Sequence, residues 1–107
     1  MQAYWHKSVY HEAMGANKSA GAAATWRDWT PAVPGNTILV EIVAKVVTAA
    51  GLVGVRKKGS ALARSVSCAI GGSVVFTTEL SEPDKAIQIY AEVDANVTFN
   101  VVGYITA

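Results

Sequence analysis

Hydrophobic and polar residues alternate one by one along much of the chain after residue 36. The alternation is clearest in two C-terminal stretches, residues 86–94 and 96–105. A period of two indicates half-buried β-strands. The break between them, from Asp94 to Asn96, is short and contains turn-forming residues, so we expect an antiparallel hairpin. Its inner face is expected to contain Ile87, Ile89, Val93, Val97, Phe99, Val101 and Ile105.

The same pattern predicts further strands in residues 37–50, 52–56, 61–70 and 73–80. The first is rich in β-branched residues, which favour strand over helix. Gly71 and Gly72 are typical of a two-residue hairpin turn. Short strands at regular spacing are typical of sandwiches and barrels. We therefore expect an all-β fold, a single antiparallel β-sandwich or small jelly roll of about six to eight strands.

The first 25 residues differ in composition from the rest, so we expect an N-terminal arm (1–25) followed by the sandwich domain (26–107). Residues 15–25 are mostly Ala, Gly and Ser, which offer little apolar surface to bury. A helix over residues 13–24 is an alternative, but two glycines disfavour it. Tyr4, Trp5 and Tyr10 suggest that the arm docks on a subunit or on a particle.

Composition restricts the partners. Charged residues make up 16% of the 107 residues, below the usual quarter. This favours either a surface covered by a partner or a neutral polar surface. A formal charge of +1 gives no electrostatic reason to expect nucleic acid or an anionic membrane. We expect neither a secretory leader nor membrane insertion, since the longest apolar stretch contains Glu41 and Lys45.

Reactive groups are few. Cys68 cannot form an intrachain disulfide and is expected to be a buried apolar thiol. His6 and His11 match no metal motif, and Glu92 with Asp94 reads as a pair of solvated carboxylates. The basic cluster of residues 56–58 with Arg64 reads as a solvated hairpin tip. These patterns predict a protein that is not an enzyme, with no metal site and no cofactor.

Four aromatic residues could stack on sugar rings: Trp26, Trp29, Tyr90 and Tyr104. Packing against a strand, a subunit or the arm is the alternative. The alternation places Tyr90 and Tyr104 on the outward side of their strands, so a hairpin would bring them together on one surface. A strand would place Trp26 and Trp29 on opposite faces, and a helix would place them on the same face.

Three segments resemble small β-sandwich modules of tailed-bacteriophage fibre, spike and capsid-decoration proteins. They are the run from Trp26 to Ile42, the tip from Val55 to Ser60 and the closing strand from Asn96 to Ile105. The resemblance is one of layout, and it covers about residues 26–106.

The resemblance implies a virion structural protein that forms a homo-oligomer, with a trimer favoured. The face made of Ala61, Ala63, Ser65, Ser67 and Ala69, or the face of Tyr90 and Tyr104, would pack between subunits. The arm would attach to capsid or tail proteins, and the sandwich would project outward, where it could contact a cell-surface glycan. Assembly would take place in the host cytoplasm. A chain of this length starting at Met1 is expected to be a free-standing head fibre, spike or decoration subunit. The alternative is a carbohydrate-binding β-sandwich module.

Overall fold

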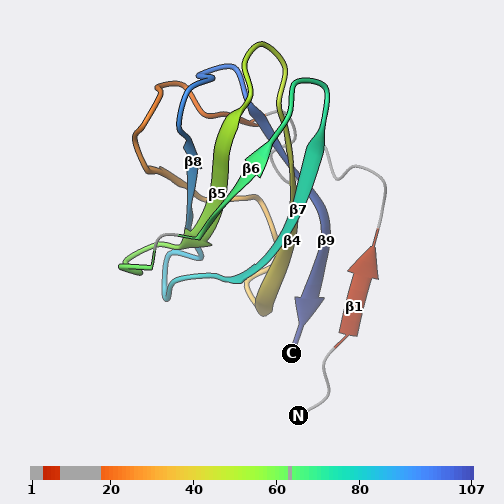
Figure 1. Cartoon of the computed structure of the whole chain (residues 1–107). Helices are drawn as coiled ribbons and strands as arrows, with labels where there is room; N and C mark the ends of the chain where they lie inside the picture. The colour runs from red at the N-terminus through yellow and green to blue at the C-terminus, as the bar shows by residue number, and fades with distance from the viewer. Residues whose placement is uncertain (1–3, 8–17, 63) are drawn as a thin grey trace.

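The computed structural model describes residues 4–7, 18–62 and 64–107. Within these residues the chain forms nine strands and no helix. The strands make two antiparallel sheets that pack face to face as a small β-sandwich (Figure 1). The predicted all-β sandwich is therefore confirmed.

Sheet A has the order β1-β9-β4-β7, and β2 also pairs with β9, at Thr98 and Phe99. Its strands are β1 (Tyr4–Lys7), β2 (Lys18–Ser19), β4 (Thr37–Lys45), β7 (Ser73–Glu79) and β9 (Thr98–Thr106). Sheet B has the order β3-β8-β5-β6. Its strands are β3 (Arg27–Trp29), β5 (Gly51–Lys57), β6 (Ser65–Cys68) and β8 (Ile87–Ala91).

The core lies between the inner faces of the two sheets. From sheet A it takes alternate residues of β4 and β9, and from sheet B alternate residues of β5 and β8, as the period of two requires. The largest fully buried apolar side chains are Phe99, Ile42, Ile87, Ile89, Val40, Val46, Val53, Val55, Val97 and Val101. Burial of each such side chain contributes roughly 1.5–3 kcal/mol to folding.

The expected C-terminal hairpin is wrong. β8 pairs with β3 and β5 in sheet B, whereas β9 pairs with β1, β2 and β4 in sheet A. The segment 92–97 crosses from one sheet to the other. The predicted hairpin at Gly71 and Gly72 is likewise wrong, because this turn joins β6 of sheet B to β7 of sheet A. Gly71 has φ of +79°, a conformation that favours glycine.

A one-residue bulge in β9 changes which of its side chains face the core. Ile42 of β4 pairs with Val101, but Glu41, the residue before it, pairs with Gly103. Val102 therefore has no partner on β4 and is the extra residue. Beyond it, Tyr104 lies opposite fully buried Val40 and packs against the core. The predicted outward position of Tyr104 and inward position of Ile105 are therefore both reversed.

Asp94 anchors the crossing to the end of β4. Its side chain is 4% exposed, and Oδ2 accepts N–H groups of residues 47–49, the shortest from Thr48 at 2.7 Å. The Thr48 hydroxyl and the N–H groups of Thr48, Asn96 and Val47 hold the pKa of Asp94 well below its usual range. Asp94 is therefore not the solvated carboxylate that the sequence suggested. Val93, predicted to lie in the core, is exposed.

Two described parts of the expected arm belong to sheet A. The backbone of β1 pairs with residues 103–106 of β9, and β2 pairs with Thr98 and Phe99. Ala20 is fully buried, and its N–H donates to the Val97 carbonyl at 2.9 Å. Residues 18–25 thus run along the sandwich before β3 begins.

Candidate functional site

An aromatic pair lies on the outer face of sheet B. Trp26, just before β3, stacks on Tyr90 of β8 with a centroid separation of 4.9 Å and an interplanar angle of 24°. Tyr90 is paired with Gly54 of β5, which has no side chain to compete with the tryptophan for this space. Both rings are half-buried.

Arg56 joins this aromatic pair to a row of polar side chains. Its guanidinium carbon lies 4.0 Å from the centroid of the Trp26 ring, within cation–π distance. Its Nε donates to Gln88 Oε1 at 2.8 Å, and Gln88 Nε2 donates to Asp28 Oδ1 at 2.9 Å. We call these five residues, Trp26, Asp28, Arg56, Gln88 and Tyr90, the Trp26 surface.

The polar row continues beyond Asp28. Lys58 Nζ lies 3.7 Å from Asp28 Oδ2 and 2.9 Å from Asp84 Oδ2. The hydrogen bond and charge of Asp84 raise the pKa of Lys58, while hydrogen bonds from Ser81 and Lys58 lower the pKa of Asp84. All these groups are largely exposed, so they orient one another without enclosing a charged site.

The structure brings together two of the aromatic residues singled out in the sequence and separates the others. Trp26 and Tyr90 share the Trp26 surface. Trp29 is 7% exposed and lies in the core, whereas Trp26 is on the outer face of sheet B, which is the arrangement of a strand and not of a helix. Tyr104 faces the core side of sheet A. The expected neighbourhood of Tyr90 and Tyr104 is therefore wrong, because their strands belong to different sheets.

The aromatic residues of the arm are only partly described. The backbones of Tyr4 and Trp5 pair with Thr106 and Ile105 of β9. Tyr10 lies outside the described residues. Their predicted role in subunit or particle contact stays a prediction.

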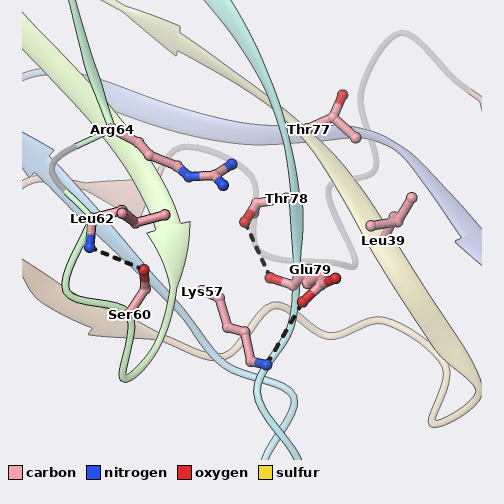
Figure 2. Close-up of a pocket in the computed structure, with 8 residues that line it drawn as sticks. All are labelled: Leu39, Lys57, Ser60, Leu62, Arg64, Thr77, Thr78 and Glu79. Carbon is pink, nitrogen blue, oxygen red and sulfur yellow. Dashed lines mark hydrogen bonds and ion pairs between the residues drawn. The ribbon is translucent and has the colours of Figure 1, made fainter.

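A cavity of about 330 Å³ lies between the β5–β6 loop and strand β7 (Figure 2). It is lined by Leu39, Lys57, Ser60, Leu62, Arg64, Thr77, Thr78 and Glu79. Lys57 Nζ and Glu79 Oε2 are 3.6 Å apart across one end. Figure 2 shows the side chains of Leu62 and Arg64 on the loop side and Glu79 on β7.

The basic cluster of the sequence does not form one patch. Arg56 turns to Trp26, Lys57 to Glu79 and Lys58 to Asp84, while Arg64 lines the cavity. Sequence reasoning missed Asp28, Gln88 and the cavity. Alternation could place Gln88 and Tyr90 on one face, but only the strand order β3-β8-β5 brings Asp28 and Arg56 beside them.

Among residues 4–7, 18–62 and 64–107 there is no group of three or more His, Cys, Asp or Glu residues arranged to hold a metal ion. His11, one of the two histidines considered for such a site, lies outside these residues. The part of the chain that the structure describes also has no helix long and apolar enough to cross a membrane.

Comparison with known proteins gives no relative from which a role could be transferred: no protein-family model matches the chain, and no curated protein matches it.

Proposed function

We propose that this chain is a non-enzymatic structural subunit of a phage-like particle, which assembles with further copies of itself. The proposal extends the resemblance of residues 26–106 to sandwich modules of phage fibres, spikes and decoration proteins. In this role the N-terminal segment attaches the subunit to the head or tail, and the sandwich projects outward, where it can meet the host surface.

The observation that carries the assembly part is a set of exposed apolar side chains on one side of the sandwich. Leu62, Val66, Ile70 and Val75 are between 48% and 61% exposed, and they lie on β6, on β7 and on the loops beside them. Apolar side chains gathered on one surface favour contact with another protein. The low proportion of charged residues, 16%, supports the same role.

Light scattering on the purified chain across a range of concentrations tests self-assembly. We expect a defined oligomer, with a trimer favoured, and Val75→Lys should weaken it because a buried ammonium group is costly. Val93→Lys is the matched control, since Val93 is similarly exposed but lies in the 92–97 crossing. A monodisperse monomer at every concentration would contradict the proposal.

Attachment to a particle needs a separate test. Electron microscopy of particles assembled with a tagged copy of this chain should show the tag at regular positions on the head or tail. The same tag on a chain that lacks residues 1–17 should be absent from the particles. Equal labelling by both chains would remove the N-terminal segment from the proposal.

The Trp26 surface favours a second candidate, a carbohydrate-binding module. It combines half-buried aromatic rings with planar polar groups on an exposed sheet face, a combination suited to sugars. A glycan array tests this. Saturable binding lost in Tyr90→Ala but kept in Tyr104→Phe would support it, and no binding by the wild-type chain would remove it.

A further inference from the structure

The outer edge of β7 is a place where a strand could be added. Within the described residues β7 pairs only with β4, so its other edge has no strand beside it. The Val46 N–H donates to the Gly72 carbonyl at 3.1 Å, which fixes the alternation of the ladder that follows. The backbone groups of Val75 and Thr77 therefore point away from β4. Only the last residue of β7, Glu79, is charged, so the edge has little protection against strand addition.

Sheet B extends one strand further than sheet A on this side. Val53 of β5 and Val66 of β6 are directly opposite and share the inward face. Val53 is 1% exposed, whereas Val66 is 48% exposed, because β7 packs more closely over β5 than over β6. Figure 1 shows β6 beside β7 at this side, with β1 at the far side of sheet A.

The free edge of β7 and the uncovered face of β6 together form a groove. We call this the β7 groove: it has Thr77 and Glu79 of β7 on one side and Leu62 and Arg64 on the other, around the cavity of about 330 Å³. Val66 of β6 is exposed and lies outside the lining of the cavity. A strand laid here would hydrogen-bond to β7, continue sheet A and cover the apolar side chains on β6.

The shape of the groove selects a single extended segment over the edge of another sandwich. Suppose that a second copy placed its β7 against the β7 of the first copy. The β5 of the second copy lies beneath its own β7, so it would need the space that β6 of the first copy already fills. A lone strand has no second layer and meets no such obstacle. The overhanging β6 therefore prevents sheet-to-sheet joining while leaving room for an arm.

We infer that residues 8–17 of a second copy occupy the β7 groove, an inference that rests on the proposed self-assembly. Lys7 pairs with Gly103 and Lys18 with Phe99, so three residues of β9 separate the two attachment points. The chain uses ten residues, 8–17, between them. This excess of chain starts and ends on the edge of sheet A opposite β7, so it can reach a neighbouring copy.

The sequence of this segment suits the groove. In an extended conformation Tyr10, Glu12 and Met14 share one face. Glu12 can pair with exposed Arg64, and the two larger side chains can cover Leu62 and Val66. The contact joins different surfaces of the two copies, so it is heterologous and closes into a ring, such as a trimer, when the rotation allows.

A labelled synthetic peptide of residues 7–18 tests the inference directly by fluorescence anisotropy. It is titrated into the full-length Glu12→Arg variant, because in the wild-type oligomer a second copy already fills the groove. We expect Thr77→Pro to weaken binding at least about tenfold, because it removes an edge-facing N–H that β4 does not use. Thr77→Val is the matched control, which keeps the N–H. No peptide binding up to about 1 mM would overturn the inference.

Charge reversal supplies a second measurement on the full chain by light scattering. Glu12→Arg and Arg64→Glu should each weaken the oligomer about tenfold, and the double variant should restore it. An oligomer unaffected by Thr77→Pro and by both reversals overturns this inference but leaves the proposed self-assembly intact. A wild-type monomer refutes the proposed self-assembly and this inference with it, even where the peptide binds in the groove.

Discussion

The indole of Trp26 lies directly over Gly54. A Cβ atom at position 54 would be 2.8 Å from Trp26 Cη2 and 2.4 Å from the carbonyl oxygen of Arg64, closer than such atoms approach. The glycine therefore leaves room for the ring, which stacks on Tyr90 and contacts the Arg56 guanidinium.

Gly54→Ala should displace Trp26 and destabilise the protein by about 1–3 kcal/mol, since the Arg64 backbone cannot easily give way. Urea unfolding measures the loss, and the indole N–H resonance of Trp26 reports the displacement. Gly35→Ala is the control, because a Cβ atom there meets nothing within 4 Å. If both variants unfold at the same urea concentration, the close packing over Gly54 is wrong.

Asp94 should make stability depend on acid pH. Its folded pKa lies below the unfolded value of about 3.9, so its stabilising contribution is complete above that value and is lost as the pH falls toward the folded pKa. Asp94→Asn should lower stability at neutral pH and flatten the decline below about pH 4. Thermal unfolding from pH 7 to pH 2 measures both effects.

The neighbouring carboxylate provides the control for that experiment. Glu92 is exposed, so Glu92→Gln should change the stability at neutral pH by less than Asp94→Asn does. Should Asp94→Asn retain the full acid dependence, the anchor between Asp94 and residues 47–49 would not be its source.

Thr37 carries a buried hydroxyl that accepts and donates no hydrogen bond within the described part of the chain. Because the side chain is fully buried, Thr37→Val removes an unsatisfied polar atom and should stabilise the protein by about 1 kcal/mol. Thr78→Val is the matched change at a buried threonine whose Oγ1 donates to the Glu79 carbonyl at 3.2 Å. That variant should instead lose about 1 kcal/mol by chemical denaturation, and equal effects would contradict the assignment.

Arg56 is expected to be irreplaceable by lysine. Its guanidinium contacts Trp26, donates Nε–H to Gln88 and donates Nη1–H to the Leu62 carbonyl at 3.1 Å. A lysine ammonium cannot reproduce this planar fork, so Arg56→Lys should cost about 1–2 kcal/mol in denaturant unfolding. The adjacent Lys57→Arg should be nearly neutral, since the Lys57 side chain forms an exposed ion pair with Glu79 that an arginine can keep.

Alternation along the chain was enough to predict the strands after residue 36 and most of the core, whereas β1, β2 and β3 were not predicted as strands. Ile87, Ile89, Val97, Phe99 and Val101 are all fully buried, as their spacing indicated. Local periodicity reports which side of a strand faces the interior, and most of these inward side chains are buried.

Strand pairing and the Trp26 surface could not be predicted in the same way. A short turn such as Asp94–Asn96 suits a hairpin and a crossing between sheets equally, and only the partners of β8 and β9 distinguish them. The bulge at Val102 inverts the alternation without leaving a sign in the sequence, which is why Tyr104 was placed on the wrong face. The groove beside β7 depends on strand order alone.

The position of β9 in the middle of sheet A has a consequence for the order of synthesis. β4 and β1 are both translated before the strand that joins them, and among the described strands only β5 and β6 are consecutive in the chain and paired. Until residues 98–106 emerge, one edge of β4 has no partner strand. The apolar side chains of β4 then lack their neighbours Phe99 and Val101. Folding must wait for these distant contacts, so the nascent chain passes through a period in which premature association is its main hazard.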